Sequence, residues 1–226
     1  LELDRLPFWS YRRFGVEALL ALGKKDEALA YAEASRGLNM PDAEIDRTCE
    51  AILVSCGRDE EAYRRYALTA HSANTYLSRF RKIAKRYPTR DEAEILDDLI
   101  ASTPGEEGKW FATAKAIGRY DLALELISGS PCDPKTLNRA ARDHLESNTT
   151  FALGAALASL RWLSEGWGYD ITARDVTDPF DFALAAADRL GMKQSVVEDL
   201  RRIVAADRSR GGFVQELIGE RMGQGM

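Results

Sequence analysis

The chain has 226 residues, of which 45% are hydrophobic and 30% are charged, with a formal net charge of −5 and a pI near 5.3. No run of the sequence reaches the roughly 18 uncharged apolar residues that a membrane-spanning helix needs, so we expect no membrane segment. The acidic balance argues against nucleic acid as the main partner, because contacts with phosphates normally require a basic surface.

Apolar residues recur at three- and four-residue spacing along almost the whole chain, and strand signals are nearly absent, so the sequence predicts an all-α protein. The first predicted helices run from an N-cap at Ser10 to Gly23, from Asp26 to about Ser35, from Pro41 to Gly57, and onward from Asp59. Later helices are predicted over 76–87, from a capping box of Thr89 and Glu92, over 110–117, 133–146 and 149–164, from Asp178 with Pro179 at its first position, around 196–204, and over Phe213–Met222. We expect about 12–13 helices in a single helical-repeat domain over 1–226, with more regular repeats over 9–128 and divergent helices over 133–222.

A short phrase recurs where one predicted helix gives way to the next. It reads glycine, a cation, any residue, an acid, any residue, alanine and a bulky apolar residue, and it occupies Gly23–Leu29, Gly57–Tyr63 and Gly118–Leu124. Glycine adopts the left-handed conformation that ends a helix, and an acid in the next first turn interacts favourably with the helix dipole. The phrase therefore predicts paired helices, and Gly191 is an eroded copy of the same joint.

The first two joints lie 34 residues apart, which is the period of the tetratricopeptide repeat. Leu22-Gly23 with Tyr31-Ala32 downstream resembles the spacing of that repeat over about the first 70 residues and again near Gly118, and the Gly-Arg-x-x-Glu-Ala phrase is similar to its inter-helix turn. The resemblance implies an α-α superhelix whose stacked helix pairs leave a concave face for a protein or peptide partner. The phrase also resembles, more faintly, the helical-repeat portions of uncharacterised bacterial proteins that accompany SWIM-type zinc fingers, but the zinc motif is absent from this sequence.

Charge is unevenly distributed in the middle of the chain. Residues 64–90 contain eight cations and no acid, whereas residues 91–107 contain seven acids and no cation. The basic segment 64–90 therefore supports an alternative function, the binding of nucleic acid or of an acidic peptide. The other interpretation is a solvated basic face that the following acidic helix neutralises.

The irregular stretch Gly166–Asp170 places a tryptophan between two glycines. Trp167 is predicted either to contact a partner, as large aromatic residues do in interfaces, or to fill a gap between helix layers. A second alternative function is an enzyme centred on residues 165–178, which requires a deep polar pocket beside Asp170, Arg174 and Asp175.

Motifs for catalysis and for cofactor binding are missing from the sequence. It contains no glycine-rich phosphate loop, Cys-x-x-Cys, His-Glu-x-x-His or nucleophile elbow, and Cys49 and Cys56 are too far apart in sequence for one zinc site. Neither histidine, His71 or His144, has a recognisable catalytic context. We therefore predict no catalytic, cofactor-binding or metal-binding residue. Three cysteines and no signal-like start indicate reduced thiols in the cytoplasm.

The prediction for function is a non-catalytic scaffold that binds a protein or peptide. Recognition is expected from the inner helices, where Phe14 lies among the candidates, from the basic segment and from the tryptophan loop. The residues predicted to contact the partner are Tyr11, Arg12, Arg64, Arg65, Arg81, Lys82, Lys85, Arg86 and Trp167.

Overall fold

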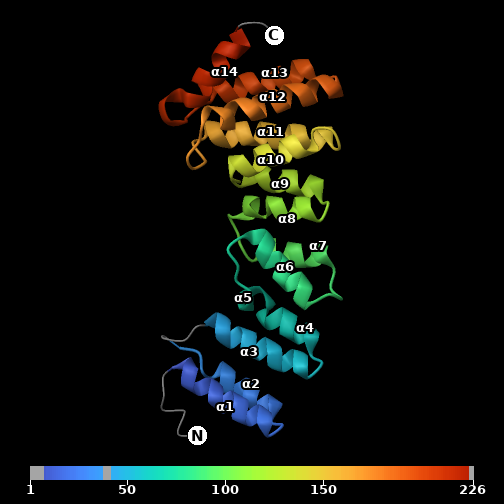
Figure 1. Ribbon diagram of the computed structural model, residues 1–226, viewed down its shortest axis with the longest axis vertical. Coiled ribbons are helices and arrows are strands. Elements are labelled where there is room, and N and C mark those ends of the chain that lie inside the picture. The colour runs from blue at the N-terminus through green and yellow to red at the C-terminus, as the bar shows by residue number, and fades with distance from the viewer. Residues whose placement is uncertain (1–7, 38–41, 224–226) are drawn as a thin grey trace. The chain divides into compact units, whose positions relative to one another are not determined.

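The computed structural model describes residues 8–37 and 42–223, and all regular secondary structure within them is helical (Figure 1). No strand occurs in those two ranges, so the predicted all-α class is confirmed. The chain divides into two compact units, Leu1–Ser102 and Thr103–Met226, and each is described by itself. The expected single domain over 1–226 stays a prediction.

The first unit is built from helices that follow one another in chain order (Figure 1). They are α1 (Trp9–Ala21), α2 (Lys25–Glu33), α3 (Asp42–Ser55), α4 (Asp59–Ala62), the π-helical segment η2 (Tyr63–Ala67), α5 (Leu68–Ala70), α6 (Tyr76–Arg86) and α7 (Glu92–Ala101). Helix α2 packs between α1 and α3, and α3 packs in turn on the continuous helix formed by α4, η2 and α5. The shared core of these helices includes Trp9, Val16, Ala28, Leu29, Ala32, Ile45, Cys49, Ile52, Leu53, Ala62 and Tyr66.

The glycine joints have the predicted conformation. Gly23, Gly57, Gly118 and Gly191 have φ values of 73°, 70°, 78° and 67°. At the first joint, the amide of Lys24 donates to the carbonyl of Leu19 at 2.9 Å, and the amide of Gly23 donates to that of Leu20 at 2.9 Å. This pair of hydrogen bonds is the Schellman motif, which satisfies carbonyls at the end of a helix, and the other three joints repeat it.

Two predicted capping residues in the first unit are wrong, although α1 begins close to the predicted position. Ser10 lies inside α1, which begins at Trp9 after Phe8, and Phe8 supplies no side-chain cap. Thr89 does not cap α7, because the carboxylate of Asp91 accepts from the amide of Ala93 at 2.7 Å and starts the helix at Glu92. The predicted start at Pro41 lies outside the described residues, and the helix is described from Asp42.

The second unit continues with helices from Glu107 onward. They are the 3₁₀ segment η3 (Glu107–Trp110), α8 (Phe111–Ala116), α9 (Tyr120–Gly129), α10 (Pro134–His144), α11 (Thr149–Ser164), α12 (Ala173–Leu190), α13 (Lys193–Ala205), the 3₁₀ segment η4 (Arg210–Gly212) and α14 (Phe213–Gly223). Helix α11 packs against α10 and α12 and has the bounds predicted for it, Thr149 to Ser164. Most of its side chains are buried, as expected for so apolar a helix.

Pro179 lies inside α12 and does not begin it, so the predicted start at Asp178 is wrong. The helix begins at Ala173 after a capping box of Thr172 and Asp175. A proline has no amide hydrogen, so the carbonyl four residues earlier, that of Asp175, loses its helical partner. The side chain of Asn138 in α10 supplies the missing donor, with Nδ2 2.8 Å from that carbonyl oxygen. The buried hydroxyl of Ser159 in α11 donates to Asn138 Oδ1 at 2.6 Å and fixes the orientation of the amide.

Candidate functional site

A groove of about 520 Å³ lies between α1 and α3 in the first unit. Its apolar surface comes from Trp9, Val16 and Ile52, which are buried, and from Leu20, which is partly buried. The remaining residues that line the groove are Arg13, Glu17, Glu44, Arg47, Thr48, Ala51 and Ser55. The groove therefore combines an apolar floor with a polar rim, which is typical of sites that bind peptides or small ligands.

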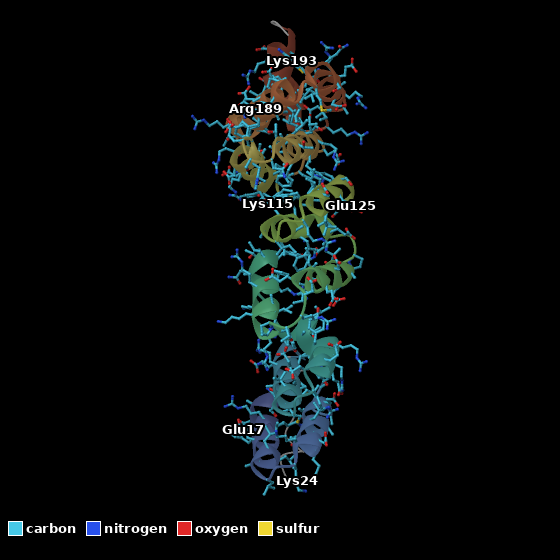
Figure 2. All side chains as sticks on the ribbon, turned by 90° about the vertical axis from the view of Figure 1, so that its right-hand side faces the viewer. Glu17, Lys24, Lys115, Glu125, Arg189 and Lys193 are labelled. Atoms are coloured by element: carbon cyan, nitrogen blue, oxygen red, sulfur yellow. The ribbon has the colours of Figure 1, made fainter. Side chains whose placement is uncertain are left out.

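Four charged side chains on the rim of this groove lack a partner of their own. Arg13 and Glu17 lie one turn apart on α1, and Glu44 and Arg47 lie one turn apart on α3. All four are exposed, and none of their side chains makes an ion pair or a hydrogen bond with a described residue, although the guanidinium of Arg13 stands over the ring of Phe14. The surface position of Glu17 is labelled in Figure 2. The rim can therefore offer both charges to a ligand without breaking an existing ion pair.

Elsewhere in the first unit, arginines near the glycine joints are paired. Arg58 lies 3.0 Å from Asp26 and 2.7 Å from Glu61, so that it links the first two joints. Arg90 lies 2.8 Å from Glu60, and its guanidinium also stands over the ring of Tyr63. These two arginines therefore stabilise the first unit, in contrast to the unpaired charges on the groove rim.

A second cavity, of about 620 Å³, lies between the start of α3 and the loop that precedes α6. His71 lines it, and His71 Nε2 lies 2.9 Å from Oε1 of the buried Glu50, which also accepts from the Tyr87 hydroxyl at 2.6 Å. Burial acts to raise the pKa of Glu50, but the hydrogen bonds from His71 and Tyr87 outweigh it and hold that pKa below its usual value. Burial, together with the bond to Glu50, raises the pKa of Tyr87. This cluster explains how a carboxylate is accommodated in the core.

His144, the other histidine, packs among aromatic rings in the second unit. Its ring centroid lies 5.3 Å from that of Tyr120 and 5.1 Å from that of Phe151. Burial, assisted by the nearby Lys115, lowers the pKa of His144. These contacts give His144 a packing role.

The π-helical segment η2 places two tyrosines in the interior of the first unit. The hydroxyl of Tyr63 donates to Asp98 of α7 at 2.7 Å, and that of Tyr66 donates to Glu33 of α2. A π-helix carries one extra residue per turn and thereby changes which side chains share a face. Here both tyrosines are buried, although each contacts a different neighbouring helix.

The structure does not gather the predicted residues of α1 into the groove. Tyr11 and Phe14 are 48% and 50% exposed, and neither lines the groove between α1 and α3. Arg12 is partly buried, and its Nη1 lies 3.4 Å from the carbonyl oxygen of Ala34 in the turn after α2. The charged residues of α1 that line the groove are instead Arg13 and Glu17, which are not among the residues predicted to contact a partner.

The predicted basic residues of α6 are exposed, and the acidic helix α7 does not neutralise them. Arg81 and Lys85 have no ion pair or hydrogen bond with any described residue, and Lys82 donates to the carbonyl of Ser72 at 2.7 Å. Arg86 Nε lies 3.9 Å from Oε2 of Glu50. None of these four residues pairs with an acid of α7 in the part of the chain that the structure describes.

The other two predicted cations lie on η2 and differ in their contacts. Arg64 is exposed and has no ion pair or hydrogen bond with a described residue. Arg65 forms ion pairs with Glu33 and with Glu61, the latter at 2.8 Å. Arg65 therefore stabilises the first unit, whereas Arg64 remains available at the surface.

The tryptophan loop lies at the surface of the second unit. Trp167 is 51% exposed, and its ring centroid lies 6.2 Å from that of the buried Trp162. The loop borders a cavity of about 440 Å³, lined by Leu163, Gly166, Trp167, Gly168, Asp170, Ile171, Ser209, Arg210, Phe213 and Val214. Arg174 and Asp175 do not line this cavity, so it lacks the polar set on which the enzyme alternative depends.

The described part of the chain contains no group of three His, Cys, Asp or Glu residues placed to hold a metal ion. Cys49 and Cys132 are buried, and burial raises their pKa values to about 11 and about 12. Over the same residues, no helix is both long and apolar enough to cross a membrane.

Comparisons with protein-family models, with curated proteins and with solved structures find no match to this chain. The tetratricopeptide-like assignment therefore stays a prediction, and any function has to be argued from the geometry of the groove.

Proposed function

We propose that this protein is a non-catalytic scaffold, built as a tetratricopeptide-like α-α superhelix, that binds a protein or peptide partner. The four repeated helix joints support the architecture, since each ends a helix with the same two hydrogen bonds. The 34-residue separation of Gly23 and Gly57 supports the assignment to this class of repeat. We also propose a cytoplasmic location, on the sequence argument from its odd number of cysteines.

The observation that carries the proposal is the groove between α1 and α3. Its floor can bury an apolar side chain of a ligand, which contributes about 25 cal/mol for each Å² removed from water. Arg13, Glu17, Glu44 and Arg47 stand on its rim without partners, so they can orient a peptide by its charges and by its backbone. A peptide is the expected occupant because the groove offers both an apolar floor and charges of both signs.

A display experiment tests the proposal. A library of random peptides is selected on the full chain, and the enriched peptides are measured against the variants Ala51→Trp and Ala30→Trp. Ala51 lines the groove, whereas Ala30 is an exposed alanine of α2 that lines none of the cavities described above. We expect Ala51→Trp to weaken binding at least tenfold, since the indole fills the groove, and Ala30→Trp to leave it unchanged.

The matched pair separates occupation of the groove from a general effect of an added tryptophan. Circular dichroism checks that both variants are folded before binding is measured. Equal binding by both variants, or the absence of any peptide enriched over an unrelated control protein, contradicts the proposal.

A further inference from the structure

Three helices of the first unit, α1, α3 and α6, have buried and exposed residues at equivalent positions that lie 34 residues apart in the sequence. One residue in each helix is buried, and the residue two positions earlier in each helix is an exposed arginine. The buried set is Gly15, Cys49 and Ile83, and the exposed set is Arg13, Arg47 and Arg81. The same offset therefore relates α6 to the first two helix pairs, although the joint after α6 lacks the glycine phrase.

The three equivalent arginines have their charges available. None of the side chains of Arg13, Arg47 and Arg81 makes an ion pair or a hydrogen bond with a described residue, although the guanidinium of Arg13 stands over the ring of Phe14 at 5.3 Å. Arg13 and Arg47 line the same groove from its two sides. Arg81 occupies the corresponding position on α6, 34 residues after Arg47, so the three arginines are equivalent by the repeat offset.

We propose that Arg13, Arg47 and Arg81, the arginine ladder, bind the carboxylates of an acidic peptide that lies across α1, α3 and α6. The proposal rests on the proposed peptide-binding function and names the class of partner. A guanidinium presents paired N–H groups that match the two oxygens of a carboxylate, so each arginine can hold one acidic side chain. Three such contacts at fixed intervals select for the spacing of acids along the peptide.

The charges beside the ladder favour a peptide over a nucleic acid. Glu17 lies one turn after Arg13, and Glu44 lies one turn before Arg47, and both acids are exposed without an ion-pair partner. A phosphate backbone carries negative charge at every step and would meet these carboxylates along with the arginines. A peptide can place acids at the arginines and neutral or basic residues beside Glu17 and Glu44.

The ladder also has a direction. Lys85 stands on α6 at the position that Glu17 occupies on α1, and it has no ion pair with a described residue. Arg81 and Lys85 therefore present two cations where α1 presents a cation and an acid. The most acidic part of the peptide is expected at α6, and its mixed or neutral part at α1.

Fluorescence anisotropy tests the ladder with a fluorescein-labelled peptide of alternating glutamate and serine at low salt. The test variant is Arg13→Glu/Arg47→Glu/Arg81→Glu, and the matched control reverses three other exposed arginines that form no ion pair with a described residue. The control variant is Arg174→Glu/Arg201→Glu/Arg208→Glu, which changes the net charge by the same amount. We expect the test variant to bind the labelled peptide at least tenfold more weakly than the wild type, and the control variant to bind within about threefold of the wild type.

The outcomes separate this inference from the proposed function. Equal loss in both triple variants, or no binding of the labelled peptide by the wild type, overturns the ladder. Tighter binding of a labelled oligothymidine than of the peptide, with loss only in the test variant, overturns it in favour of a nucleic acid. If displayed peptides still bind and are blocked by Ala51→Trp while the test variant has no effect on them, the ladder is wrong and the scaffold function stands.

Discussion

Asn138 is the residue whose replacement should reveal how α12 tolerates its internal proline. Its side-chain amide donates to the carbonyl of Asp175 at 2.8 Å, in place of the amide hydrogen that Pro179 lacks. The substitution Asn138→Ala removes this donor and leaves a carbonyl without a partner, which costs about 1–3 kcal/mol. Ser159 loses its 2.6 Å acceptor at the same time but stays 3.3 Å from the carbonyl of Pro134, so its contribution is smaller.

A double-mutant cycle with Pro179→Ala isolates this role of Asn138. An alanine at position 179 can donate its own amide to the carbonyl of Asp175, so Asn138 is no longer the required donor. We expect Asn138→Ala to lower the free energy of unfolding by about 2 kcal/mol in the wild type and by about 1 kcal/mol less in the Pro179→Ala background.

Urea unfolding followed by circular dichroism measures both values. Asn74→Ala is the control, because Asn74 is exposed and forms no hydrogen bond with a described residue, and it should change the free energy of unfolding by less than about 0.5 kcal/mol. Equal costs of Asn138→Ala in the two backgrounds would refute the reasoning.

Three further predictions concern the joints, the buried carboxylate and the thiols. Gly57→Ala should lower stability by about 1–2 kcal/mol in urea unfolding, because φ is 70° there and the added Cβ meets no other atom within 4 Å, which leaves only backbone strain. Glu50→Gln should cost about 1–3 kcal/mol near neutral pH. The pKa of Glu50 is lowered by folding, so the stabilisation is present above its unfolded pKa of about 4.3 and is lost as the pH falls through the folded pKa. The difference between wild type and variant should therefore shrink as unfolding curves are recorded at successively lower pH below about 4.3. Maleimide labelling of the native protein, read by mass spectrometry, should modify the exposed Cys56 and leave Cys49 and Cys132 unreacted, since burial raises the pKa values of the last two to about 11 and about 12.

Features that depend on neighbouring residues in the sequence were predicted well. The glycine joints at Gly23, Gly57 and Gly118 formed as expected, because a left-handed residue between two amphipathic helices is a local requirement. The bounds of α11 were also correct, since Asn148 caps its first turn and its apolar face is continuous. The predicted cap of α7 was wrong because two neighbouring residues can cap a helix here. Asp91 forms the cap that Thr89 was expected to form.

Features that depend on a distant residue could not be read from the local pattern. Pro179 indicates a helix start when only its neighbours are considered, whereas the donor that makes it tolerable inside α12 comes from Asn138 in another helix. The interpretation that α7 neutralises the basic face of α6 was wrong for a similar reason. Arg90, at the joint between the two helices, lies within 3.9 Å of both Glu94 and Asp98 and occupies acids that α6 was expected to meet.

The charged residues of the groove were not predicted, because the sequence alone did not show which side of α1 faces α3. A signal for that side was nevertheless present in the sequence. Tyr11 and Arg12 were predicted as partner contacts on an inner helix, but the side of α1 that borders the groove is the one that carries Arg13 and Glu17. The repeat period could have found that side without a structure. Arginine recurs 34 and 68 residues after Arg13, at Arg47 and Arg81, which is the offset between the joints at Gly23 and Gly57, and all three arginines are exposed. We therefore propose that an exposed residue type that returns at this offset marks the face that binds the partner, and that it is a better guide to that face than aromatic or basic character alone.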